Sequence, residues 1–415
     1  MRSTFIAIGI ALSWPLSPDA LVRLGNGAGQ WRLGFLVGLG LATVLSGMAA
    51  AVIRNPKTAD GRNHDAGSLL ADGLGPLPAM TIVIASRVSL ALLLSTGLLV
   101  TAGYTFNEIF VYWFPNFGFS YLLLAFILLA HLAGGRAALV LQPVFAATAV
   151  GGLASLVLLG LGSPGASGPL PTMAMPALPI STASALVLFL GYDVTTSWPD
   201  GGSRLPVLAG LSGILLLFCG WSLVSLAHLP AQRLAESTIP HILAARAIAG
   251  EAGRILMGVA VIAGTCAAVN GIFLIARRSL ASLAAQNLLP GHRQGVFPDG
   301  IHVAVFAAII SVMMASGLAG ASVLETYIEA ALLLWLFSVA IQCLAAFRLL
   351  RDTDGCQAAL AAVTGLLFAG GAVVLLSFHG EAKDIARFLA ILLLSVFMVS
   401  ALWLRLNRDA GGVLH

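Results

Sequence analysis

The chain has 415 residues, of which 59% are hydrophobic and only 9% are charged. A soluble domain carries about 25% charged residues, so this composition excludes a protein that folds alone in water. The net charge of +4 is small and does not indicate a nucleic-acid partner. The four cysteines show neither metal-ligand spacing nor a disulfide framework. The apolar residues instead fall in blocks of about 18 to 25, the length of a membrane-spanning helix.

These blocks predict an all-α polytopic protein of about twelve spans, because backbone polar groups in lipid must be satisfied within their own segment. In chain order the predicted spans are 3–24, 31–53, 76–103, 117–133, 137–161, 181–199, 205–228, 253–283, 300–319, 323–347, 358–378 and 385–405. The long connection 229–252 contains a run, 241–249, with the composition of a short surface helix. This run is either a gate or a simple connector.

The distribution of Lys and Arg predicts the orientation in the membrane. With the N-terminus in the cytoplasm, 13 of the 21 basic residues lie in cytoplasmic segments and 7 lie outside. Cytoplasmic loops carry an excess of such residues, so we expect both termini to be cytoplasmic. The expected location is the cytoplasmic or inner membrane. The sequence leaves the oligomeric state open, a homo-oligomer included.

Two of the predicted spans are interrupted after apolar runs of similar length. In the first span, Pro15, Pro18 and Asp19 break the apolar run, and in the sixth span Gly191 and Asp193 do so. Each proline removes a backbone donor and clashes with the preceding turn. We therefore expect residues 13–19 and 191–199 to be non-helical near the middle of the membrane. The alternative is that each interruption is only a kink against neighbouring helices.

Interruptions at matching places in two halves of a chain point to a transporter binding site. Spans one and six would then open two inverted five-span repeats, over about 3–161 and 181–347. The repeats would form a transport core within 1–350, and 351–415 would add two C-terminal helices.

Several short motifs occur in the order and spacing of a known family. They are Leu74-Gly75-Pro76-Leu77, then Gly135-Arg136 with Leu141-Gln142, then Gly191-Tyr192-Asp193 with Asp200, Arg204 and Pro206, and finally 276–280 with 287–290. With these motifs the chain resembles the amino acid–polyamine–organocation transporter superfamily over most of residues 4–350. At 11–13 it has Ala-Leu-Ser where the family has Gly-x-Gly, the place where the family holds a substrate carboxylate.

The resemblance implies a secondary transporter that moves an amino acid or a related amine by alternating access, either by exchange or coupled to Na⁺ or H⁺. It implies no cofactor and no resident metal. A membrane scaffold or accessory subunit that keeps the fold without transport is the alternative. The sequence contains no paired catalytic acids, histidine cluster or nucleophile–base spacing, so we do not expect an enzyme.

The candidate site residues are those at the two interruptions and the charges inside spans, since a charge at membrane depth indicates function. The predicted substrate-binding residues are Ser13, Trp14, Ser17, Asp19, Arg87, Gly191, Tyr192 and Asp193. Asp193 and Thr265 are the candidates for ion coupling. Three structural alternatives remain open: Asp193 caps a half-helix, Arg87 belongs to a buried pair, and Thr265 bonds to its own helix.

Overall fold

The computed structural model describes residues 2–12, 14–56, 64–163, 177–192, 205–289 and 300–411. Eight helices in these ranges are long and apolar enough to cross a membrane. They are α3 (Leu33–Arg54), the continuous run of α5 (Pro76–Ser89), η1 (Leu90–Leu94) and α6 (Ser95–Ile109), α8 (Gly135–Gly162), α11 (Leu205–His228), α13 (Pro240–Ala285), α15 (Ser322–Leu350), α16 (Gly355–Phe378) and α17 (Ala382–Gly411). The expected all-α, multi-pass membrane protein is confirmed.

The remaining helices are shorter. They are α1 (Arg2–Ala11), α2 (Pro18–Trp31), α4 (Ala66–Leu74), α7 (Asn116–Leu132), α9 (Leu178–Val187), α12 (Ala231–Glu236), α14 (Ile301–Ala315) and the 3-10 turn η3 (Leu318–Gly320). Four of the twelve predicted spans are therefore not single helices of spanning length among the described residues. The first is divided into α1 and α2, the sixth is described only to residue 192, and α7 and α14 have 17 and 15 residues.

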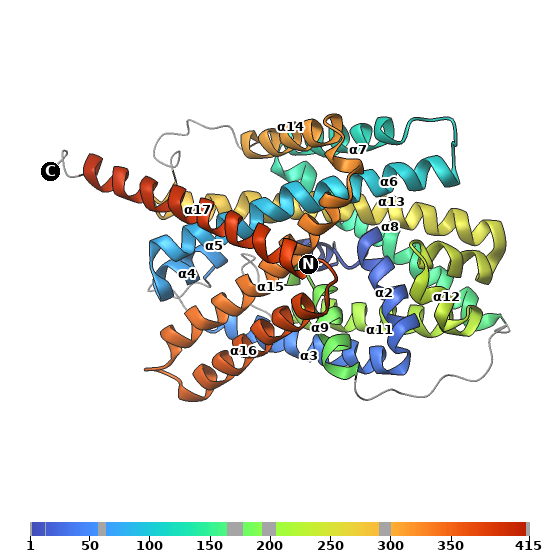
Figure 1. Ribbon diagram of the computed structural model, residues 1–415, viewed down its shortest axis with the longest axis horizontal. Helices are drawn as coiled ribbons and strands as arrows, with labels where there is room; N and C mark the ends of the chain where they lie inside the picture. The colour runs from blue at the N-terminus through green and yellow to red at the C-terminus, as the bar shows by residue number, and fades with distance from the viewer. Residues whose placement is uncertain are drawn as a thin grey trace.

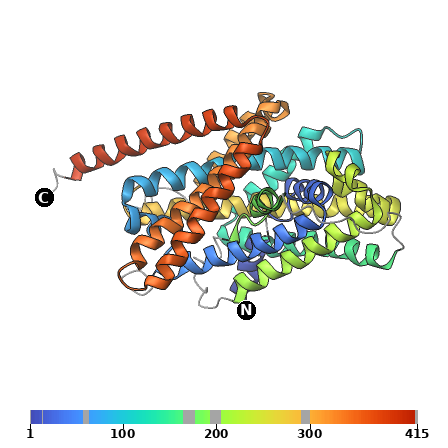
Figure 2. The ribbon, with the colours of Figure 1, turned by 60° about the horizontal axis from the view of Figure 1, so that its bottom comes forward.

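Several long helices follow the long axis of the molecule, while α15 and α16 cross it obliquely (Figure 1). In Figure 1, α6 and α13 run side by side along this axis, and α4 and α12 lie at opposite ends of it. Figure 2 shows α15 and α16 paired, while the end of α17 extends beyond the bundle. The short helices α4 and α12 are therefore placed to cover opposite faces of the membrane-spanning region.

A buried polar crossing holds α1 against α8 and α13. The Gln142 side-chain nitrogen donates to the carbonyls of Gly9 and Ala267, both at 3.0 Å. The Asn270 side-chain nitrogen donates to Gln142 Oε1 at 2.6 Å and to the Ala138 carbonyl at 3.0 Å. Because a buried polar group must be paired, these bonds fix where α1 ends relative to the two long helices.

The connection before the long part of α13 is mostly helical. It contains α12 and the first residues of α13, and α13 kinks at Ala249 and Gly250, where Gly250 has φ +60°. Residues 241–248 are helical, close to the predicted surface helix. This layer packs tightly on α2: a Cβ on Gly29 would overlap the backbone of Ala231 and Ala235.

Candidate transport site

The first predicted span is interrupted between Ala11 and Pro18. α2 begins at Pro18 because Ser17 caps it, with Oγ accepting from the backbone N–H of Ala20 at 3.2 Å, and because proline fits the first helical position. The expectation that residues 18 and 19 are non-helical is therefore wrong. Ser13 lies outside the described residues.

The sixth predicted span loses its helical form earlier than expected. α9 ends at Val187, residues 188–191 form a turn, and Gly191 has φ +96°, a conformation that favours glycine. Asp193 and the rest of the predicted interruption, 194–199, lie outside the described residues.

One side chain connects the two interruptions. Trp14 is 1% exposed, and its indole N–H donates to the carbonyl of Val187 at 2.7 Å. Nearby, Tyr192 packs edge-on against Trp335, with ring centroids 6.0 Å apart. The cavity between Ala11, Phe189 and Tyr192 has a volume of about 10 Å³. The described side chains that line this cavity thus leave almost no open space in it.

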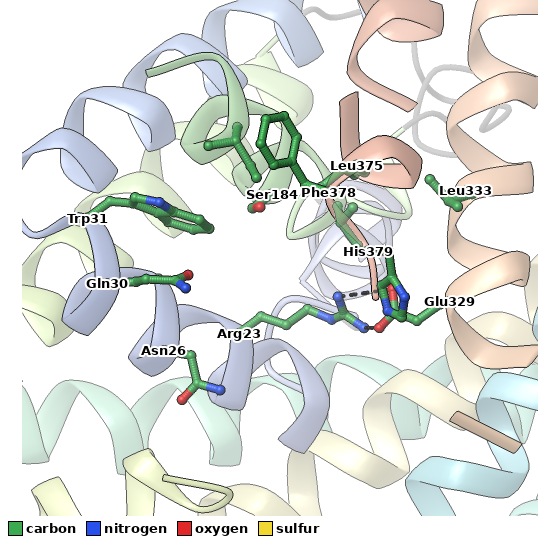
Figure 3. Close-up of a pocket in the computed structure, with 13 residues that line it drawn as sticks. Arg23, Asn26, Gln30, Trp31, Ser184, Glu329, Leu333, Leu375, Phe378 and His379 are labelled. Atoms are coloured by element: carbon green, nitrogen blue, oxygen red, sulfur yellow. Dashed lines mark hydrogen bonds and ion pairs between the residues drawn. The ribbon is translucent and has the colours of Figure 1, made fainter. Parts of the chain in front are cut away.

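A much larger cavity lies beside the second half of the first span. This cavity, called the vestibule below, has a volume of about 670 Å³ between α2, α9, α15 and α16. Figure 3 shows its lining residues Arg23, Asn26, Gln30, Trp31, Ser184, Glu329, Leu333, Leu375, Phe378 and His379. A second cavity of about 400 Å³, the side cavity, is lined by Asp19, Leu98, Tyr104 and Glu325 among others.

Arg23 links the residues of the two cavities. Its Nε bonds Asp19 Oδ2 at 2.7 Å within α2, and its terminal nitrogens bond both carboxylate oxygens of Glu329 on α15. Figure 3 shows the guanidinium directed at Glu329. Asp19, predicted as a substrate ligand, is therefore engaged in an ion pair. The two cavities together hold three carboxylates and one guanidinium, because Glu325 adds to this cluster.

Arg87 and Thr265, two further predicted site residues, do not line these cavities. Arg87 is 3% exposed, sits in the last turn of α5, and does not line the vestibule, the side cavity or the small central cavity. Its pairing with Asp193 stays a prediction. Thr265 is buried and donates to the carbonyl of Val261 at 2.9 Å, a bond within its own helix. Its role in ion coupling is likewise untested.

Sequence reasoning missed Arg23 and Glu329. Both lie within predicted spans or at their ends, so their charges at membrane depth were the available signal. They are 306 residues apart in the sequence, and no local pattern indicates that residues so distant form an ion pair.

Comparison with known proteins identifies the class of the fold. No family model matches the chain, and no curated protein matches it. The solved structures that match include a manganese transporter from Eremococcus coleocola in complex with an aromatic bis-isothiourea compound. It is 12% identical, covers 97% of this chain and 94% of its own, and has a TM-score of 0.55. The chain therefore shares its overall fold with this manganese transporter.

This match corrects the family expected from the sequence. The near full-length likeness is to a manganese transporter, whose family is distinct from the amino acid–polyamine–organocation superfamily, so that assignment is wrong. The motifs behind it are short and rich in Gly, Pro and Leu. Such stretches suit any membrane protein with interrupted helices, so their order did not distinguish one transporter family from another.

Proposed function

We propose that the protein is a secondary transporter that carries a small cation between its two interrupted helices by alternating access. The observation that carries the proposal is the meeting of two half-helix C-terminal ends. α1 ends at Ala11 and α9 at Val187, and Ala11 lines one small cavity with Phe189 and Tyr192, which lie just beyond the end of α9. A helix C-terminus carries partial negative charge and exposed carbonyls, both of which favour a cation.

The charged side chains around the two larger cavities also favour a cationic cargo. Asp19, Glu325 and Glu329 outnumber Arg23 along the vestibule and the side cavity. A surplus of carboxylates along an access route raises the local concentration of cations. The sequence predicted an amino acid or a related amine as cargo. Of these two, a protonated organic amine fits the negative charge of the cavities.

A carboxylate-bearing cargo is less well supported. The N-terminal end of α2, where amides could hold an anion, is capped by the protein: Ser17 bonds Ala20 and Leu21. The sequence also lacks the Gly-x-Gly at 11–13 that the expected family would have. We therefore propose an amine in preference to an α-amino acid.

A divalent metal ion is the second candidate, and the manganese transporter of similar fold favours it. Manganese takes carboxylate and carbonyl oxygens as ligands. Within the described ranges there is no group of three or more His, Cys, Asp or Glu residues that could hold a metal. A metal cargo would therefore depend on carbonyls at the interruptions together with Asp193.

The finer architecture also remains part of the proposal. Two inverted five-span repeats, 3–161 and 181–347, would provide the two alternating arrangements, and the two interruptions in comparable places support them. Asp193 and Thr265 remain the candidates for Na⁺ or H⁺ coupling, for which Asp193→Asn is the first test.

Uptake into liposomes tests the cargo class. Purified protein would be supplied separately with labelled methylammonium, phenethylammonium, an anionic amino acid and Mn²⁺, with protein-free liposomes as the control. We expect saturable uptake of an ammonium ion and none of the anion. Uptake of Mn²⁺ alone would favour the second candidate. Uptake of only the anion would contradict a cation carrier, and no uptake at all would favour the scaffold alternative.

A further inference from the structure

The Trp14 side chain occupies the gap where cargo would have to pass. Residues 12–17 separate α1 from α2, yet Trp14 is 1% exposed, and the cavity lined by Ala11 and Pro15 is only about 10 Å³. A water molecule needs at least about 10–15 Å³ of such space and several polar partners. In this state that cavity has no room for even a small amine, so a side chain must move before cargo binds there.

Trp14 also forms a hydrogen bond with a carbonyl that a cationic cargo would need as an acceptor. The carbonyl of Val187 lies at the end of α9, and its only other described donor is the N–H of Leu190 at the long distance of 3.4 Å. The Trp14 indole N–H reaches the same oxygen at 2.7 Å. The indole thus presents an apolar body and an N–H donor, two features that it shares with a protonated amine that carries a small hydrocarbon group.

Other buried tryptophans do not make such a bond. Trp221 and Trp335 are both 0% exposed, and neither indole nitrogen has a hydrogen-bond partner among the described residues. The bond of Trp14 is therefore a specific feature of the interruption, because burial of an indole in this protein does not by itself bring a partner.

We propose that Trp14 is an internal stand-in for the cargo: its indole holds the Val187 carbonyl in the empty carrier and is displaced by a protonated amine. This inference rests on the proposed function and narrows its cargo to a donor-bearing cation with a small apolar body. Because the binding-competent state requires Trp14 to leave, the indole bond lowers the apparent affinity for cargo.

The test compares Trp14→Phe with Trp221→Phe in methylammonium and phenethylammonium uptake. Phenylalanine keeps an apolar ring but cannot bond Val187, whose oxygen still accepts from Leu190. Loss of one ordinary hydrogen bond from the empty state should lower KM about fivefold. We expect Trp221→Phe to keep the parental KM. Size-exclusion chromatography checks that both variants are folded.

Trp14→Ala tests the same idea by size. The vacated space should raise the uptake of phenethylammonium relative to methylammonium, and free indole should inhibit this variant more strongly than the parent. A parent that transports an ammonium ion, with unchanged KM in Trp14→Phe and unchanged selectivity in Trp14→Ala, would overturn the stand-in and leave the proposed function intact. A parent that transports no cation would contradict the proposed function and the inference with it.

Discussion

Gly264 packs directly against the backbone of the interruption in the first span. A Cβ added to Gly264 in α13 would overlap the carbonyl oxygen of Leu16. Overpacking of a tight contact costs about 1–3 kcal/mol. We expect Gly264→Ala to lower the thermal unfolding temperature in detergent and to reduce transport, because the backbone at residues 14–17 must shift.

Gly213→Ala is the matched control for this prediction. Gly213 also lies in a long helix, α11, but nothing lies within 4 Å of a Cβ added there. Alanine is the better helix former, so this variant should be as stable as the parent or slightly more stable. Equal unfolding temperatures for the two variants would show that Leu16 and Gly264 are not in close contact.

Arg23 carries the ion pairs beside the two cavities. Arg23→Gln would leave Asp19 and Glu329 without their shared cation. We expect a loss of about 1–2 kcal/mol in unfolding free energy, less than for a fully buried pair, because 24% of the Arg23 side chain is exposed. Thermal denaturation measures this loss.

Arg387→Gln provides the comparison, since Arg387 pairs with Asp384 where both side chains are more than half exposed. This pair should contribute less than about 1 kcal/mol. A loss in Arg23→Gln no larger than that in Arg387→Gln would mean that the Arg23 pairs do not hold α2 against α15.

At the scale of elements, Gln142 joins three helices. Gln142→Leu would remove the donor to Gly9 and Ala267 and the acceptor for Asn270. A buried group left without its partner costs about 1–3 kcal/mol, and here several groups lose theirs. We expect a clear fall in unfolding temperature, whereas Gln232→Leu, at an exposed position of α12, should change it little. An unfolding temperature like that of the parent would show that α1 is held by apolar packing alone.

At the scale of the whole molecule, the sequence predicts which face is cytoplasmic. Cys356, at the start of α16, is the exposed one of the four cysteines, and the Lys and Arg bias places it inside. A membrane-impermeant maleimide should therefore label Cys356 in inside-out vesicles and leave it unlabelled in right-side-out vesicles. Gel mobility or fluorescence of the labelled protein measures the result.

Ser316→Cys in a Cys356→Ser background checks the opposite face. Ser316 is exposed and follows α14, on the side where the sequence places an external loop. It should react in right-side-out vesicles. The reverse pattern for both cysteines would contradict the predicted orientation.

The sequence by itself determined eight of the predicted spanning helices and the interruption after Ala11, because the length of apolar runs and the positions of Pro15 and Pro18 act locally along the chain. Only the tertiary structure decided which groups meet there. Trp14 bonds a carbonyl 173 residues away, and Arg23 bonds a carboxylate 306 residues away. These contacts depend on how distant helices pack, which no local pattern of residues encodes. The likeness to the fold of a manganese transporter likewise lies in the arrangement of whole helices.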